Sequence, residues 1–244
     1  MSGSSGTAAP SGAVARPGSA TPSGSAAPSG RAAWGILGGT FDPIHLGHLA
    51  IAEQVCETLG LEGVVFVPAA QNPHKDVRPS PALDRIAMVE LAIAGNQRFR
   101  ASRVELDREG PSYTVDTLEA FHAQGRHAGA DRPDPVLILS VEAVAGLPAW
   151  HRVERILELA RVAVVPRRGY PPPSADWLAA AFPGRADRFL LLDGPDLGHS
   201  ASDIRTRVAA GRSIRYLVPD DVRAWIARRS LYGTRAADGG PWDR

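Results

Sequence analysis

The chain has 244 residues and carries 27 Lys and Arg against 26 Asp and Glu, which leaves a net charge of about +1. Such neutrality argues against a protein that coats nucleic acid or a membrane surface, because both functions need a basic excess. A single cysteine, Cys56, excludes an internal disulfide framework and a multi-cysteine zinc site. No apolar run approaches the roughly 18 residues of a transmembrane helix, so we expect a cytoplasmic protein.

The first 30 residues are predicted to form a disordered tail. Most of them are Ser, Gly, Ala or Pro, and none is acidic, so they bury too little apolar surface to offset the entropy lost on ordering. They contain no continuous apolar stretch of the kind found in a secretory signal, and their Gly and Pro disfavour the amphipathic helix of a transit peptide. Residues 234–244 are predicted to form a second flexible tail, so the folded domain would span residues 31–233.

Between these tails, short apolar runs alternate with helical patterns. The first run, Trp34–Leu37, predicts a strand that ends at a glycine pair, and the apolar spacing from Ala52 to Leu59 predicts the helix that follows it. The later elements are predicted in this order: strand 64–67, helix 83–94, strand 99–106, helix 114–121, strand 136–141, helix 153–160, strands 162–165 and 189–192, and helices 202–210 and 219–229.

Strands separated by helices of about a dozen residues are typical of a parallel sheet with helices on both faces. We therefore predict an α/β protein with a Rossmann-like, doubly wound parallel sheet and a small helical C-terminal part. Sheets of this type bind ligands at the carboxyl ends of their strands, where the winding reverses. The residues that directly follow each strand are therefore the candidates for function.

The eleven residues GGTFDPIHLGH, at positions 38–48, follow the first strand and suit a phosphate group. Gly38 and Gly39 allow the backbone to approach a ligand, because neither has a Cβ. His45 and His48 are three residues apart and share a face of the first helical turn, where N–H groups and the helix dipole favour an anion. A simple glycine turn and a metal site on the two histidines are alternatives, whereas a dinucleotide-binding turn would need the spacing G-x-G-x-x-G.

This string resembles the signature of the nucleotidylyltransferase superfamily with its HxGH motif, and four further segments resemble the bacterial nicotinate-nucleotide adenylyltransferases within it. Residues 72–75 are similar to a P-H-K loop, residues 111–118 to an SYT-x-x-TL segment, and residues 147–151 to an L-P-x-W segment. Residues 203–205 with 213–219 are similar to the family's C-terminal signature. The resemblance covers about residues 31–232, in the family's order.

The resemblance implies transfer of AMP from ATP to nicotinate mononucleotide, which gives nicotinate adenine dinucleotide and pyrophosphate in NAD biosynthesis. A related adenylyl- or cytidylyltransferase with another phosphorylated acceptor, and a non-catalytic nucleotide-binding protein, are the alternatives. ATP and nicotinate mononucleotide would be the partners, with no role for nucleic acid or a membrane, and a homo-oligomer is compatible with the sequence. Mg²⁺ would arrive with ATP and keep several waters, so no metal-binding side chains are expected.

The resemblance also implies roles for individual residues. His45, His48, Lys75 and Arg205 would contact phosphate oxygens, and His48 is expected to stabilise the transition state. Lys75 is the only lysine in the chain, which fits the need for a compact charge on a phosphate. The other residues expected at the nucleotide are Gly38, Gly39, Thr40, Phe41, Ser140, Glu142 and Ser202. Of these, Ser202 would also cap the helix that opens near Asp203.

Three residues are predicted at the acceptor. Trp150 would stack on the pyridine ring, with a core tryptophan as the alternative. Tyr113 and Thr114 would line the same pocket from the start of a helix, with simple capping as the alternative. Arg167 and Arg168 also follow a strand, but solvated arginine is commoner there, so neither is assigned.

The chain departs from the family's pattern in three places, one of which is Asn72, where the family usually has Pro. Where the family has G-x-D after a strand, this chain has Ser140-Val141-Glu142. Where the family has S-S-T before D-I-R, this chain has Ser200-Ala201-Ser202. Neutral drift is one explanation, and a changed substrate preference or reduced activity is the other.

Overall fold

The computed structural model describes residues 33–70, 79–127, 133–194, 198 and 200–233. The predicted tails, and the segment that contains Lys75, lie outside these residues, so the domain limits and the role of Lys75 stay predictions. Within the described ranges, no helix is both long and apolar enough to cross a membrane.

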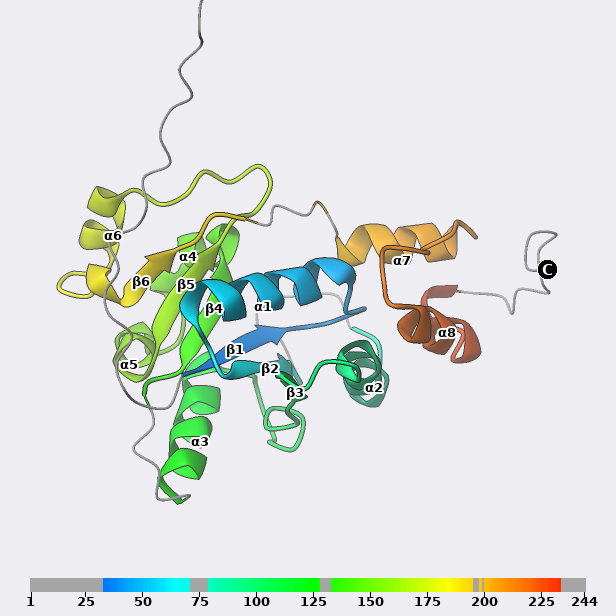
Figure 1. Ribbon diagram of the computed structural model, residues 1–244, viewed down its shortest axis with the longest axis horizontal. Coiled ribbons are helices and arrows are strands. Elements are labelled where there is room, and N and C mark those ends of the chain that lie inside the picture. The colour runs from blue at the N-terminus through cyan, green and yellow to red at the C-terminus, as the bar shows by residue number, and fades with distance from the viewer. Residues whose placement is uncertain (1–32, 71–78, 128–132, 195–197, 199, 234–244) are drawn as a thin grey trace, which may run out of the picture.

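Six strands form one parallel sheet in the order β3-β2-β1-β4-β5-β6 (Figure 1). Their bounds are β1 Trp34–Gly39, β2 Gly63–Pro68, β3 Phe99–Ala101, β4 Val136–Ser140, β5 Arg161–Val165 and β6 Phe189–Leu191. The order confirms the predicted doubly wound sheet, because the chain winds outward in one direction from β1 and in the other from β4. Such a sheet binds ligands at the carboxyl ends of its two central strands.

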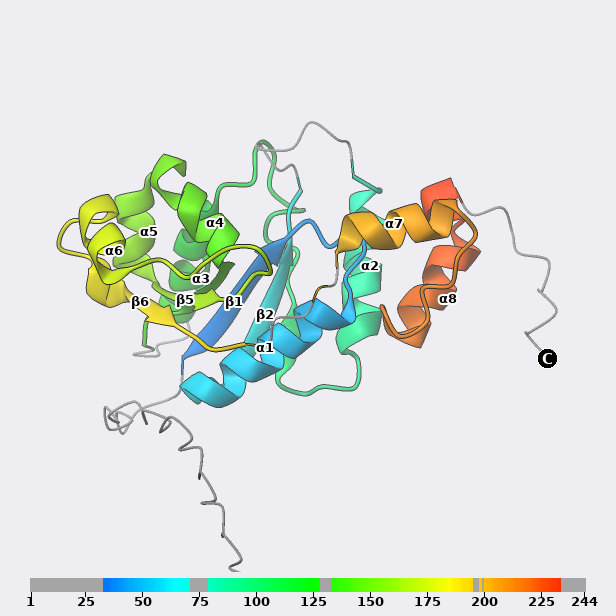
Figure 2. The ribbon, with the colours of Figure 1, turned by 90° about the horizontal axis from the view of Figure 1, so that it is seen from above.

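Helices cover both faces of the sheet, as the view from above shows (Figure 2). One face carries α1 Leu46–Leu59 and α2 Ala82–Ile93, together with the C-terminal helices α7 Ala201–Ala209 and α8 Asp220–Arg228. The other face carries α3 Thr114–His127, α4 Val141–Gly146, α5 Val153–Leu159 and α6 Ala175–Ala181. Among the described residues there are also three short 3₁₀ helices: η1 Leu147–Ala149, η2 Ala186–Arg188 and η3 Leu231–Gly233.

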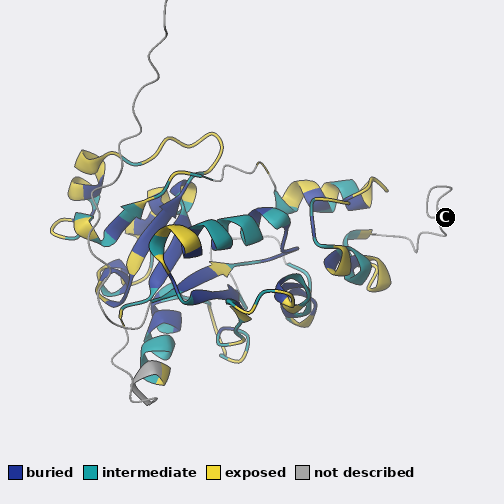
Figure 3. Ribbon diagram, viewed as in Figure 1, coloured by how far each residue is buried: buried dark blue, intermediate teal, exposed yellow. Residues whose placement is uncertain are grey.

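The four central strands are mostly buried (Figure 3), and the sheet divides the core into two apolar clusters. Successive side chains of a strand point to opposite faces of a sheet. Ile36 therefore packs with α3, α4 and α5, whereas Leu37 packs with α1 and α2. The alternating packing explains why the central strands are continuous apolar runs in the sequence.

The C-terminal helices are fastened to α2 by a buried carboxylate. Asp84 is almost fully buried, and its Oδ1 accepts hydrogen bonds from Trp225 Nε1 at 3.2 Å and from Arg229 Nε at 2.9 Å. Both donors lie on or directly after α8. The contact places α8 beside α2 and carries the end of the folded chain toward the loop that follows β1.

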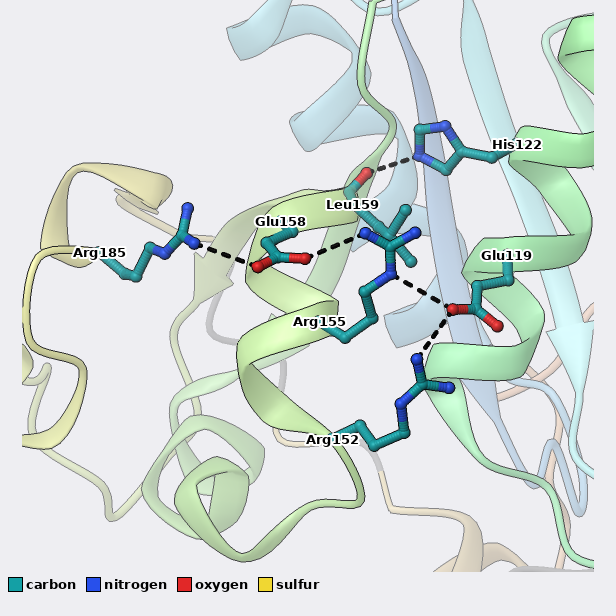
Figure 4. Close-up of polar contacts among 7 residues, drawn as sticks. All are labelled: Glu119, His122, Arg152, Arg155, Glu158, Leu159 and Arg185. Atoms are coloured by element: carbon teal, nitrogen blue, oxygen red, sulfur yellow. Dashed lines mark hydrogen bonds and ion pairs between the residues drawn. The ribbon is translucent and has the colours of Figure 1, made fainter.

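Charged side chains tie α5 to α3 and to η2 on the surface (Figure 4). Glu119 of α3 accepts from Arg152 and Arg155, and Glu158 pairs with Arg155 and Arg185. These side chains are about half exposed, so each pair contributes at most ~1 kcal/mol. Their structural effect is to anchor Arg152, which directly follows Trp150 and His151 in the chain.

Most predicted boundaries shift by one or two residues, and the helix predicted at 114–121 continues to His127. Three of the differences have a visible cause. The strand predicted at 99–106 ends at Ala101, because the chain then turns and brings Glu105 into the interior. The strand predicted to end at Val141 stops one residue earlier, since Ser140 caps α4 by accepting a bond from the Ala143 N–H at 3.2 Å. The helix predicted from Ser202 begins at Ala201 and is capped by Ser200. The short helices α4 and α6 were not predicted.

Candidate active site

Two cavities meet at the carboxyl end of β1, and Gly39 lines both of them. The first, of about 290 Å³, lies between the loop after β1 and the start of α7, and its lining includes His45, His48 and Arg205. We call it the histidine cavity. The second, of about 150 Å³, lies over β1 and β4, and its lining includes Tyr113 and Trp150. We call it the tryptophan cavity.

Most of the predicted site residues line one or both of the two cavities. The histidine cavity is lined by Gly39, Thr40, Phe41, His45, His48, Ser202 and Arg205. The tryptophan cavity is lined by Gly38, Gly39, Tyr113, Thr114 and Trp150. Ser140 and Glu142 line neither of these two cavities. Lys75 lies outside the described residues.

The two histidines form a fixed pair at the start of α1. His45 is the residue before the first helical turn, and its backbone N–H donates to Nδ1 of His48 at 3.2 Å. The two rings are stacked, with centroids 3.7 Å apart and planes 21° apart. Because Nδ1 of His48 is an acceptor, a neutral ring carries its proton on Nε2. His48 Nε2 is therefore a hydrogen-bond donor at the positive end of the helix dipole.

Phe41 explains the need for a glycine at position 39. Its backbone has a positive φ of 50°, and its ring is buried under the loop, edge-on to His48 at a centroid distance of 5.1 Å. A Cβ on Gly39 would meet that ring at 3.1 Å. A Cβ on Gly38 would meet no protein atom within 4 Å. The packing of the Phe41 ring therefore favours glycine at position 39, whereas the protein leaves room for a side chain at position 38.

Arg205 is brought to the histidine cavity from the distant helix α7. Its Nη1 donates to the backbone oxygen of Asp42 at 2.7 Å, and its Nη2 donates to Ser202 Oγ at 3.1 Å. The predicted cap role of Ser202 was wrong, since Ser200 occupies the N-cap and accepts a long 3.5 Å contact from the Asp203 N–H. Ser202 instead lines the cavity and orients the guanidinium of Arg205.

Arg167 also lines the histidine cavity. Its sequence position alone does not assign it a role, because an arginine that follows a strand is more often solvated. It lies just after β5, the neighbour of β4, and its Nε pairs with Glu142 Oε2 at 3.5 Å. The position after β5 is the signal that could have found it. The same pair gives Glu142 a partner at the rim of the site, while Ser140 serves as the cap of α4.

The tryptophan cavity has aromatic walls. Trp150 lines it and also packs against the apolar cluster beneath, so its place against the core leaves it accessible from the cavity, and its stacking on a pyridine ring stays a prediction. Tyr113 lies beside His151, with ring centroids 4.5 Å apart. The rings of Trp150 and Tyr113 each offer aromatic surface to a planar ligand in this cavity.

Glu105 is a buried carboxyl group that the sequence did not single out. It lines the tryptophan cavity with 7% of its surface exposed, and Thr117 Oγ1 donates to its Oε1 at 2.6 Å. Burial raises the pKa of Glu105, although hydrogen bonds from Thr117 and Ser112 act in the opposite direction. Ser112 Oγ in turn accepts the Ala70 N–H at 2.9 Å. Glu105 thus supports the wall that carries Tyr113.

Replacing Glu105 with glutamine is expected to flatten the pH dependence of stability. The folded protein holds the Glu105 proton to a higher pH than the unfolded chain, whose glutamate has a pKa near ~4.3. The free energy of unfolding of the wild type therefore falls as the pH rises through that window. Denaturant titrations at a series of pH values should show this slope reduced in Glu105→Gln and unchanged in Glu154→Gln, an exposed control. An equal slope in Glu105→Gln and the wild type would contradict the assignment of this pH dependence to Glu105.

The polar groups of the histidine cavity suit an anion. The histidine pair, Arg205 and Arg167 supply donors and positive charge, whereas the Asp42 carboxylate already accepts the Ser80 N–H at 3.2 Å and the Tyr232 hydroxyl at 2.7 Å. Among the described residues, no group of three or more His, Cys, Asp or Glu side chains is arranged to hold a metal ion. The arrangement can bind phosphate groups beside a flat ring.

Comparisons with known proteins agree with this geometry. Residues 36–207 match the family model described as cytidylyltransferase-like. A protein of Herpetosiphon aurantiacus named probable nicotinate-nucleotide adenylyltransferase is 44% identical over 200 residues, which are 81% of this chain and 97% of that protein. A protein of the same name from Roseiflexus sp. strain RS-1 is 47% identical over 199 residues, which are 81% of this chain and 96% of that protein.

A solved structure supports the fold. The nicotinic acid mononucleotide adenylyltransferase of Plasmodium falciparum, complexed with NaAD, superimposes with a TM-score of 0.67 at 16% identity and covers 83% of this chain and 98% of its own. At this identity the likeness concerns the fold alone. The matched segments, the long alignments and the shared sheet lead to one conclusion: the chain belongs to the nicotinate-nucleotide adenylyltransferase family of cytidylyltransferase-like proteins.

Proposed function

We propose that this protein transfers AMP from ATP to nicotinate mononucleotide, releasing pyrophosphate and forming nicotinate adenine dinucleotide for NAD biosynthesis. The observation that carries this proposal is the junction of the two cavities at Gly39. A cationic cavity suits the triphosphate, and an aromatic cavity suits the pyridine ring. The phosphate of the mononucleotide would then lie between them, next to the α-phosphate of ATP. The names of the relatives support the same choice of substrates.

The reaction requires alignment of the two substrates and does not require a general base. The attacking group is a phosphate whose second pKa is about 6, so it is largely ionised at neutral pH. Catalysis then consists of holding two polyanions in line and stabilising the charge that builds on the α-phosphate and on the leaving pyrophosphate. His48 Nε2, His45 and Arg205 supply donors for this task at the N-terminus of α1.

The acceptor would lie in the tryptophan cavity. Trp150 would stack its ring on the pyridine, and Tyr113 and Thr114, at the start of α3, line the same cavity. Gly38, which also lines this cavity, leaves space beside the backbone where a side chain would stand. The phosphate end of the acceptor would point toward Gly39, where the two cavities meet.

Mg²⁺ fits this site as a companion of ATP. The polar side chains that line the histidine cavity are mainly hydrogen-bond donors and cations. Its one carboxylate, that of Asp42, already accepts hydrogen bonds from Ser80 and Tyr232. Bound to the phosphates, Mg²⁺ would supply further neutralisation of their charge. The residues that line the cavity would orient the phosphates to which Mg²⁺ is bound.

An acceptor panel tests the proposed function. Purified protein, ATP and Mg²⁺ would be incubated with nicotinate mononucleotide, nicotinamide mononucleotide and non-pyridine phosphate esters, and pyrophosphate release would be followed, with CTP in place of ATP as a control. We expect turnover with ATP and nicotinate mononucleotide. Turnover with a different acceptor alone would instead assign a related nucleotidyltransferase, and ATP binding without any turnover would assign a nucleotide-binding protein.

A further inference from the structure

Arg85 of α2 is a buried cation outside both cavities. It is 1% exposed and donates to three backbone oxygens: Nη1 to Thr40 at 2.8 Å, Nη1 to Ala69 at 2.7 Å, and Nε to Ser80 at 2.9 Å. These oxygens belong to the loop after β1, the end of β2 and the approach to α2. One guanidinium therefore joins three loops behind the site.

A buried guanidinium is a costly way to join loops. Removing a charged group from water carries a large free-energy penalty, and well-packed apolar residues often do as well for stability alone. The environment of Arg85 reflects this, since burial lowers its pKa, and the nearby Asp42 charge acts in the opposite direction. Stability alone does not account for a planar donor with bonds in three directions.

The bonds of Arg85 set the direction of two backbone N–H groups. In a trans peptide, the C=O of one residue and the N–H of the next point in opposite directions. With the Thr40 oxygen on Arg85, the Phe41 N–H points away from Arg85, and Phe41 lines the histidine cavity. With the Ala69 oxygen on Arg85, the Ala70 N–H points to Ser112 Oγ, which it reaches at 2.9 Å beside the tryptophan cavity.

The loop after β1 is also fixed from its other end. The Asp42 oxygen accepts from Arg205, and the Asp42 carboxylate accepts from Ser80 N–H and Tyr232 OH. Arg85 and Arg205 thus hold the carbonyl oxygens of Thr40 and Asp42. The peptides between them have little freedom to rotate.

We propose that Arg85 is a positioning residue for the transfer reaction: it orients the backbone around Thr40 and Ala69, and so keeps the Phe41 peptide at the histidine cavity in register with the Ala70–Ser112 contact at the wall of the tryptophan cavity. This inference rests on the proposed function for its kinetic effect, but its structural effect is independent of the acceptor. A misplacement of about 1 Å at a site of in-line transfer can reduce the rate ~10²-fold. Loss of Arg85 should therefore lower kcat more than it raises the KM for ATP.

The test compares Arg85→Lys and Arg85→Met with Asp84→Asn. Lysine keeps the charge but loses the planar fork, and methionine keeps much of the volume without polar atoms. Asp84 is the neighbouring residue on α2, is equally buried, and bonds only toward α8 in the contacts described above. It therefore controls for a loss of stability that does not involve the cavities. All four proteins are assayed well below their Tm, with kcat calculated per folded enzyme.

We expect kcat to fall about 10-fold in Arg85→Lys and about 100-fold in Arg85→Met, with less than a ~3-fold change in the KM for ATP. Asp84→Asn should lower the Tm and leave kcat unchanged. Amide exchange followed by NMR gives a second readout: Ala70 should exchange faster in Arg85→Lys and as in the wild type in Asp84→Asn, with Phe182 of the α6 end as an internal reference.

Two results would overturn the proposal. Wild-type kcat in Arg85→Lys at a temperature where it is folded would show that the three bonds serve stability alone. Unchanged Ala70 exchange in Arg85→Lys would show that Arg85 does not orient that peptide. If Arg85→Met does not fold, Arg85→Lys decides. If the wild type fails to use nicotinate mononucleotide, the proposed function falls, while the exchange experiment still tests Arg85.

Discussion

His48→Ala is expected to lower kcat at least ~10²-fold, with a smaller change in the KM for ATP. The scale is that of removing one donor that stabilises developing charge. His48 Nδ1 is engaged by the His45 N–H, which fixes the ring and makes Nε2 the donor at the start of α1. Because such a donor acts on charge that grows in the transition state, its loss affects kcat more than ground-state binding. Steady-state pyrophosphate release over a range of ATP concentrations gives both constants.

The control must separate catalysis from helix capping. His48→Ala also removes the contact with the His45 N–H, and loss of a capping contact costs about 0.5–2 kcal/mol. Assays should therefore be run well below the Tm of the variant. His122→Ala is the matched control, since His122 contacts the Leu159 oxygen at 2.8 Å and lines neither cavity (Figure 4). An unchanged kcat in His48→Ala would remove the role assigned to it.

Local sequence signals were sufficient for the sheet and for the first turn of α1. The strands are short apolar runs because both faces of the sheet are covered, and this pattern can be recognised without a structure. His45 and His48 are close because they are three residues apart, so their pairing also follows from the sequence. Two of the errors fell at boundaries where a single hydroxyl, that of Ser140 or Ser200, decides where a helix begins. The short helices α4 and α6 were missed altogether.

The partners that hold the site could not be predicted in the same way. Arg85 bonds to Thr40 across 45 positions, and Tyr232 bonds to Asp42 across 190. These contacts depend on how α2 and the C-terminal segment pack against the sheet, and no local pattern encodes that arrangement. Burial of polar groups such as Glu105 is equally a property of the fold and not of the neighbouring residues.

Arg205→Ala is expected to lower kcat/KM at least ~10²-fold. Two nitrogens of Arg205 bond to the Asp42 oxygen and to Ser202 Oγ, which hold the guanidinium at the histidine cavity. The guanidinium has five N–H donors in a fixed plane, so the remaining ones can serve phosphate oxygens. Alanine removes this charge and also releases the Asp42 carbonyl, so both substrate binding and alignment should suffer. Arg205→Lys should recover part of the loss, since it keeps the charge without the fork.

The matched control for Arg205 lies on the same helix. Arg207 is half-buried, its Nε donates to the Ser213 oxygen at 3.0 Å, and it lines neither cavity. Arg207→Ala removes an equal charge from α7, so it corrects for the long-range effect of charge on ATP binding. We expect kcat/KM of Arg207→Ala to stay within ~3-fold of the wild type, well below the loss of one charge-stabilising contact. A folded Arg205→Ala that matches Arg207→Ala would mean that phosphate stabilisation depends on the helix terminus and the histidines, and that Arg205 acts only as a tie between α7 and the loop after β1.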